Sequence, residues 1–184
     1  MSGATTLYKG FFQLDRVALP NGRAEEVLRT SNSVCVLIYD QTLDRFILVR
    51  QARASQISET NPTGQITELA AGRFDGAYTV RQLMAKEVRE ETGIEVSEQD
   101  FVLLNGGQPM AVSAGAMTER SYLGYVSVRT DEDLSAESKT YGLASEQESI
   151  NRVTLKRVQA ERYLQGGCED IRVFALLTWA LNHK

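Results

Sequence analysis

The chain has few cysteines, few prolines and a single histidine, and these shortages limit what it can be. Its 184 residues include 2 Cys, 3 Pro and 1 His. Two cysteines cannot build a disulfide framework, and Cys35 stands in an apolar run where a buried small hydrophobe is expected. Three prolines leave little room for a Pro-rich linker. His183 is next to last, so we expect a tail residue rather than a catalytic base.

The sequence also lacks a long apolar segment and an excess of positive charge. Its apolar run at 173–181 is interrupted by Thr178 and is too short to span a bilayer. The first residues show no basic region followed by an apolar stretch, so no secretory signal is expected. The formal net charge is −4, from 20 Lys plus Arg and 24 Asp plus Glu. We therefore expect a cytoplasmic protein without a nucleic-acid or membrane partner.

Strand-like and helix-like segments follow one another without strict alternation. A hairpin is expected over 11–30, across the turn Pro20-Asn21-Gly22, followed by a strongly apolar strand at 33–39 and its partner at 46–50. The segment 51–65 resembles a long loop, and 131–148 an exposed acidic loop. Helices are expected at 79–92, 155–165 and 170–181, the last apolar nearly all round and well buried. This order predicts an α/β fold, with a mixed β-sheet sandwiched between helices.

The helix at 79–92 carries three glutamates on one stripe. At about 100° per residue, Glu91 and Glu90 fall about 40° and 60° to either side of Glu87, in line with the apolar residues of the first half. Neighbouring carboxylates repel by about 1 kcal/mol in water and about 3 kcal/mol at a dielectric near 20. Mg²⁺, which takes oxygen ligands, would turn this repulsion into binding. On the helix alone, a solvated face with an ordinary Lys86–Glu90 pair remains the more common explanation.

The wider segment 72–94 resembles the signature of Nudix hydrolases. That signature is Gly, five residues, Glu, seven residues, then Arg-Glu-aliphatic-x-Glu-Glu-x-Gly-aliphatic. The matching positions are Gly72, Glu87, Val88, Glu90, Glu91, Gly93 and Ile94. Two positions depart, because Tyr78 stands where the first Glu belongs and Lys86 where the Arg belongs. In the family those two side chains mainly brace the catalytic loop and helix.

Three further segments resemble the ADP-sugar and GDP-sugar pyrophosphatase branch of that family. Residues 48–53, Leu-Val-Arg-Gln-Ala-Arg, look like its V-R-Q-F/Y-R strand. Residues 67–72, Thr-Glu-Leu-Ala-Ala-Gly, look like its E-x-P-A-G approach to the catalytic loop, with Ala70 in place of Pro. Residues 141–148 are similar to an acidic loop that supplies a general base in ADP-ribose members. The resemblance implies a Nudix fold over 33–184, preceded by a β-hairpin segment over 1–32 that forms a homodimer.

The resemblance also implies roles for individual residues. Mg²⁺, for which Mn²⁺ can substitute, would be held by the Ala71 carbonyl, Glu87, Glu90 and Glu91. Glu90 would also be catalytic, and the general base would be Glu146 or Glu148, unless both simply belong to a solvated acidic loop. Substrate would be bound by Arg50, Arg53, Glu68 and Glu119. Because strand side chains alternate, Arg50 and Arg53 would point to opposite faces unless the strand ends near Arg50. Glu68 could pair with a substrate-facing Arg or bind metal, or it could simply be an edge-strand charge.

Two functions of different classes follow from these residues. The first is Mg²⁺-dependent hydrolysis of a nucleoside diphosphate linked to a sugar, of the ADP-ribose or GDP-mannose type, to a nucleoside monophosphate and a sugar phosphate. The second is a Nudix-fold module that senses a nucleotide with little turnover, which the departures at Tyr78 and Lys86 favour.

Overall fold

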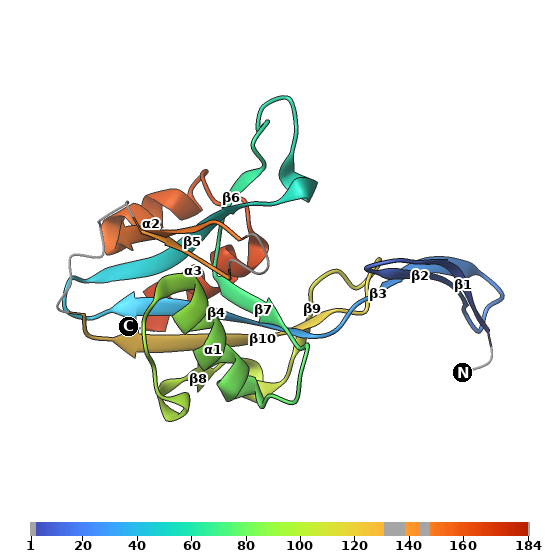
Figure 1. The fold of residues 1–184 in the computed structure, drawn as a ribbon, viewed down its shortest axis with the longest axis horizontal. Helices are drawn as coiled ribbons and strands as arrows, with labels where there is room; N and C mark the ends of the chain where they lie inside the picture. Colours follow the sequence, from blue (N-terminus) through green and yellow to red (C-terminus); the bar gives the residue numbers. More distant parts are fainter. Residues whose placement is uncertain (1–2, 131–138, 144–147, 184) are drawn as a thin grey trace.

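A central strand, β4, organises the body of the protein in the computed structural model, which describes residues 3–130, 139–143 and 148–183. Alternate β4 side chains point to opposite faces of the sheet, and both faces are covered by helices (Figure 1). The even-numbered Val34, Val36 and Ile38 pack under α1, whereas Cys35 and Leu37 pack under α3. The predicted mixed sheet between helices is therefore confirmed. No helix in the described residues has the length and apolar character needed to cross a bilayer.

The elements run along the chain in an order that mixes strands and helices. The strands are β1 (Ala4–Lys9), β2 (Gln13–Ala18), β3 (Ala24–Arg29), β4 (Ser33–Asp40), β5 (Arg45–Ala52), β6 (Gln65–Glu68), β7 (Ala70–Arg73), β8 (Val102–Leu103), β9 (Met110–Ala111), β10 (Arg120–Val128), β11 (Thr140–Tyr141) and β12 (Ile150–Lys156). The helices are α1 (Val80–Thr92), α2 (Arg157–Leu164) and α3 (Ile171–His183), with 3₁₀ turns at Ala54–Gln56, Glu98–Asp100 and Asn105–Gly107.

The large sheet is mixed and splits near its centre. Its main path is β11-β12-β5-β4-β10-β8, in which β10 runs parallel to β4. β4 and β5 pair only at one end, through Ile38–Asp40 and Arg45–Ile47. Beyond that point β7 pairs with the first half of β4, and β6 pairs with the second half of β5. The two inserted strands follow one another in the chain, so they carry the segment 65–73 into the split.

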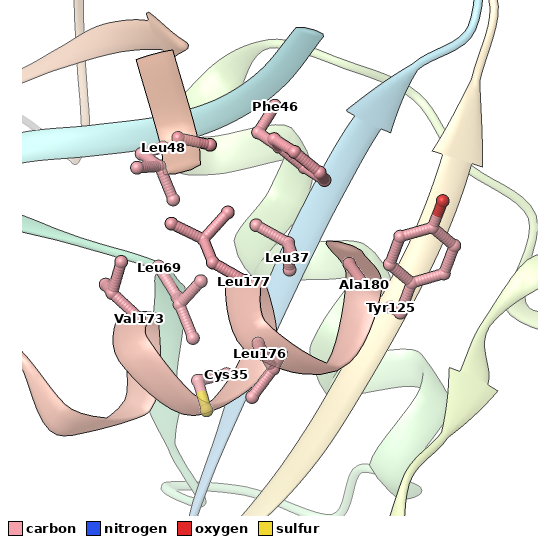
Figure 2. Close-up of a cluster of buried hydrophobic side chains, with 11 residues drawn as sticks. Cys35, Leu37, Phe46, Leu48, Leu69, Tyr125, Val173, Leu176, Leu177 and Ala180 are labelled. Carbon is pink, nitrogen blue, oxygen red and sulfur yellow. The ribbon is translucent and has the colours of Figure 1, made fainter. Parts of the chain in front are cut away.

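The second core lies on the α2 and α3 face and is shown in Figure 2. Leu37 and Phe46 from the sheet meet Leu176, Leu177 and Ala180 of α3, all of them buried. The predicted last helix is confirmed, but the expectation that it is well buried holds only for one side of it. Ile171 and Phe174 are exposed, because only one stripe of α3 faces the sheet.

A separate three-stranded antiparallel sheet, β1-β2-β3, projects from the body at the N-terminal end (Figure 1). The predicted hairpin corresponds to β2 and β3, which pair across the turn after Ala18. The prediction was incomplete, because β1 adds a third strand that pairs with β2. All six β1 residues are exposed, so that strand has no inward-facing apolar pattern by which it could be found in the sequence.

Candidate active site

The split between β4 and β5 opens onto a cleft that collects most of the predicted site residues. Arg53, Glu68, Ala71 and Glu119 line it, together with the three glutamates of α1 and Glu148. The N-terminal sheet contributes to the same cleft, through Gln13, Arg29 and the turn at Lys9–Phe12. Arg50 does not line this cleft. β5 continues to Ala52, so its side chains still alternate at Arg50, and the Arg50 side chain is exposed to solvent outside the cleft.

Local sequence signals set where α1 begins and ends. Thr79 caps the first turn. Its side chain accepts a hydrogen bond from the Gln82 backbone N–H, and the Gln82 side chain accepts one from the Thr79 backbone N–H. Gly93 ends the helix with φ of 70°, in the left-handed region where glycine carries no steric penalty. Leu83, Met84 and Val88 are fully buried against the sheet, and this packing fixes the rotation of the helix.

That rotation turns Glu87 and Glu91 inward. Their exposed fractions are 8% and 4%, so the glutamates of the stripe do not form a solvated face. Glu91 Oε2 accepts a hydrogen bond of 3.0 Å from the Ala71 backbone N–H. The carboxylate of Glu87 lies directly against Gly72, at a place that the Cβ of any other residue would fill. The α1 carboxylates are therefore held against the backbone of β7.

Burial makes both inward carboxylates unusually basic. Loss of water raises the pKa of Glu91 well above its ordinary value, and the backbone hydrogen bond from Ala71 only partly opposes this. Burial also raises the pKa of Glu87, against the opposing positive charge of Lys86. Glu148 adds a further negative charge close to both groups. The site therefore places several carboxylates close enough for their negative charges to repel one another, a condition that favours binding of a cation.

Lys86 is the cation that the protein itself supplies. Its Nζ lies 3.1 Å from Glu87 Oε1 and 2.7 Å from Glu90 Oε2. Burial disfavours its charge, but the hydrogen bond to Glu90 and the charge of Glu87 outweigh this and raise the pKa of Lys86. Within the described residues no three acidic, His or Cys side chains stand as a preformed metal cluster. Lys86 thus lies between the carboxylates of Glu87 and Glu90.

A chain of ion pairs lies beside the carboxylates in the cleft. Arg53 Nε donates to Glu68 Oε2 at 2.7 Å, and Arg172 donates to Glu68 Oε1 at 3.3 Å. Arg172 also pairs with Asp170 at 2.9 Å, and Asp170 accepts from the N–H groups of Arg172 and Val173 at the start of α3. Glu68 is thus a buried, doubly paired carboxylate rather than an edge-strand charge. Arg53 itself also lines the cleft.

The remaining predicted residues fall into three different situations. Glu119 accepts a hydrogen bond of 2.7 Å from the Ser33 hydroxyl at the cleft wall. Glu148 Oε2 accepts from the Leu143 backbone N–H at 3.2 Å and faces the cleft. Glu146 lies outside the described residues.

Sequence reasoning missed two groups in the cleft. Arg172 pairs with a residue 104 positions away, so no local pattern could indicate it. The guanidinium of Arg73 lies 5.2 Å and 4.9 Å from the ring centroids of Phe11 and Phe12. The adjacent aromatic residues at 11–12 were the signal in the sequence that could have indicated this contact. Two neighbouring aromatic side chains in a turn suggest a surface that contacts another group.

Comparison with known proteins agrees with this geometry. No family model matches the chain. The chain is 30% identical to the ADP-ribose pyrophosphatase of Escherichia coli (strain K12), over 97% of this chain and 86% of that protein. It is 31% identical to the Haemophilus influenzae ADP-ribose pyrophosphatase, over 98% and 85% of the two chains. It is also 28% identical to the GDP-mannose pyrophosphatase of Enterobacter sp. (strain 638), over 84% and 75%. With similarity across nearly its whole length and the glutamate helix in place, the chain belongs to the Nudix hydrolase family, among the relatives of ADP-ribose and GDP-mannose pyrophosphatases.

Proposed function

We propose that this protein hydrolyses the diphosphate bond of a nucleoside diphosphate sugar of the ADP-ribose or GDP-mannose type. The observation that carries the proposal is the pair of buried carboxylates, Glu87 and Glu91, held against β7 in a cleft that also presents Arg53. The printed names of the relatives agree with this substrate class. The products would be a nucleoside monophosphate and a sugar phosphate.

The residues present fit a divalent cation. Carboxylate and carbonyl oxygens are the ligands that Mg²⁺ prefers, and Mn²⁺ accepts the same set. We propose that Glu87, Glu90, Glu91 and the Ala71 carbonyl hold the metal, and that it takes over the role of the Lys86 ammonium. When bound, the metal neutralises the diphosphate and makes water a better nucleophile.

The remaining steps belong to the side chains of the chain itself. A carboxylate accepts a proton from the attacking water, whose oxygen bonds to one phosphorus while the bridging P–O bond breaks. Glu148 and Glu146 are the candidate bases, and Glu148 is supported by its place in the cleft near Glu87 and Glu91. Arg53 offers its terminal nitrogens to a phosphate, because Glu68 engages its Nε. Glu119, at the cleft wall, completes the proposed substrate-binding set, and Arg50, which lies outside this cleft, is left out of it.

The experiment is a panel of nucleoside diphosphate derivatives with coupled phosphate detection, with and without Mg²⁺. We expect turnover of a nucleotide sugar that requires the metal and that falls sharply in either Glu148→Gln or Glu146→Gln. The variant with the larger fall identifies the base. Absence of metal-dependent turnover across the panel would contradict the proposed function.

One observation favours a second function, in which the protein senses a nucleotide with little turnover. Lys86 already forms ion pairs with both Glu87 and Glu90, and it stands where the family signature has Arg. If its ammonium competes successfully with a metal, substrate could bind without being cleaved. Calorimetric binding of a nucleotide sugar without product release would support this alternative.

We also propose that residues 1–32 form a separate segment that joins two copies of the chain into a homodimer. β1 is exposed along its whole length, and Leu7, Tyr8 and Phe11 are exposed large hydrophobics. A small sheet without a core needs a partner surface. Because this sheet also contributes to the cleft, dimerisation would shape the substrate site.

A further inference from the structure

Tyr141 occupies a junction that the reaction proposed above does not use. It lies in β11, which pairs with β12 and contacts the C-terminal end of α1. The Arg152 guanidinium lies 4.7 Å from the centroid of its ring, and the Lys139 ammonium lies 5.2 Å from the same centroid. Both distances are within the range of cation–π attraction. Two cations therefore contact the ring. One is Lys139, just before β11, and the other is Arg152 on β12.

The same ring packs against the end of the glutamate helix. A Cβ placed on Gly93 would lie only 2.7 Å from Tyr141 Cε1, so the ring uses the space that glycine leaves open. Arg152 also donates to the Thr92 carbonyl at 3.3 Å. The next residue along the chain, Gly142, donates its N–H to the Glu90 carbonyl at 3.1 Å. Tyr141, Gly142 and Arg152 thus join β11 and β12 to the last turn of α1.

This junction leads directly to Glu148. The Leu143 N–H donates to Glu148 Oε2 at 3.2 Å, and the Glu148 N–H donates to the Leu143 carbonyl at 3.3 Å. The Leu143 backbone therefore holds one oxygen of the Glu148 carboxylate. Leu143 in turn follows Gly142, whose N–H is hydrogen-bonded to the backbone of α1, the helix that carries Glu87 and Glu91.

We propose that the Tyr141–Arg152 stack is a positioning device that sets Glu148 relative to the carboxylates of α1. Tyr141 and Arg152 do not touch substrate; they act through the Gly142 and Leu143 backbone. This inference rests on the proposed function, in which Glu148 faces the reacting diphosphate. A misplacement of about 1 Å in a catalytic group can cost about 10²-fold in rate, so a loosened junction has a measurable effect.

The test compares Tyr141→Leu with Tyr141→Phe. Phenylalanine keeps the ring and the cation–π contacts, whereas leucine keeps apolar volume without the ring face. Arg152→Lys is an intermediate variant, because it keeps a cation near the ring but loses the guanidinium that also donates to the Thr92 carbonyl. Three quantities are measured for each: kcat and KM on the nucleotide sugar turned over by the wild type, and hydrogen exchange of the Gly142 and Leu143 amides. The thermal midpoint verifies that each variant is folded.

In Tyr141→Leu we expect kcat to fall by about 10-fold or more with KM within about threefold, and the two amides to exchange about 10-fold faster. Tyr141→Phe should match the wild type in all three quantities. Faster exchange with unchanged kcat would overturn the proposal, as would equal losses in the Phe and Leu variants. If the wild type turns over no nucleotide sugar, the proposed function has failed. The exchange measurement then stands alone, and unchanged exchange in Tyr141→Leu would refute the junction itself.

Discussion

The two sheets of this protein bury their residues in opposite ways. In the large sheet, β4 is buried from Ser33 to Ile38 because helices cover both of its faces. In the N-terminal sheet, β1 is exposed at every position, and the buried residue of β2 is an aspartate, Asp15. Asp15 is held by the side chains of Thr6, Gln13 and Arg29, so that sheet is organised by polar contacts rather than by an apolar core.

The difference separates what stabilises the protein from what completes its cleft. The body has two apolar cores and can therefore place unfavourable buried carboxylates at fixed positions. The N-terminal sheet is attached through a few contacts, chiefly β3 hydrogen bonds between Leu28 and the segment 116–118, and the Arg73 contacts with Phe11 and Phe12. We expect changes in the body to abolish chemistry, and changes in the N-terminal sheet to alter association and substrate affinity.

The largest expected effect is in the body. Glu91→Gln keeps an oxygen that can accept from the Ala71 N–H but removes the charge. We expect kcat to fall by about 10²-fold or more, because changing even a residue that only supports a metal ligand typically lowers activity by about 10- to 100-fold. The thermal midpoint without metal should not fall, because an unfavourable buried charge has gone. Steady-state phosphate release and thermal unfolding measure the two effects. The matched control is Glu95→Gln, at an exposed position just past α1. Near-full metal-dependent activity in Glu91→Gln would refute the assignment of Glu91 as a metal ligand.

The next effect is on association and concerns the N-terminal sheet. We expect the wild type to sediment as a dimer, and Leu7→Asp with Tyr8→Asp to weaken the dimer by about 100-fold or more, since each buried large apolar side chain contributes about 1.5–3 kcal/mol. Sedimentation equilibrium measures the mass. Ser97→Asp with Gln99→Asp adds the same charge at exposed sites on the body and should leave the dimer intact. A wild-type monomer of 20.4 kDa at all concentrations would contradict the dimer.

A smaller effect is expected at the contact between the two regions. Arg73→Gln removes a cation placed over two aromatic rings, an interaction of about 0.5–1 kcal/mol at an exposed site. KM for the nucleotide sugar should rise by about two- to fivefold while kcat stays the same. Arg73→Lys keeps a cation and should lie closer to the wild type. A fall in kcat instead of a rise in KM would mean that this part of the cleft takes part in the chemistry.

The smallest effect is an opposite pH dependence of the two regions. Hydrogen bonds from Gln13 and Arg29 lower the pKa of Asp15 below 3.8, so its stabilisation is present above that pH and is lost on acidification below it. Burial raises the pKa of Glu87 and Glu91 above 4.5, so the metal-free body is stabilised by protonation and loses stability as the pH rises above 4.5. Hydrogen exchange of β2 and α1 amides in EDTA, corrected for intrinsic rates, measures both. If the protection of β2 and α1 amides changed in the same direction with pH, these opposite pKa shifts would be contradicted.

Much of the body could be predicted because its signals are local. The helix at 79–92 is confirmed as α1, since Thr79, Gly93 and the apolar spacing all act within a few residues. The same spacing placed the glutamates on the inward stripe, where Glu87 and Glu91 are indeed buried. Their burial is a position and not a role, so metal binding by the three glutamates and the Ala71 carbonyl stays a prediction. The catalytic and substrate-binding roles of the other proposed site residues also stay predictions.

Other features could not be predicted, because their cause lies in distant parts of the chain. The Ala-Ala-Gly stretch of β7 has low strand propensity and becomes a strand only by pairing with β4 where β5 diverges. β1 is exposed along its length and left no hydrophobic pattern. Arg50 was predicted to bind substrate, but it is exposed outside the cleft because the strand continues past it.

The sequence by itself determined the family, the glutamate helix and the central apolar strand, because capping, periodicity and motif spacing act over short distances. Only the tertiary structure decided how these parts meet. It brought Arg172 to Glu68 across 104 positions and set Tyr141 against the end of α1. Side-chain pairs of this kind depend on the register of strands and the rotation of helices. Those are fixed by packing over the whole core rather than by any one segment.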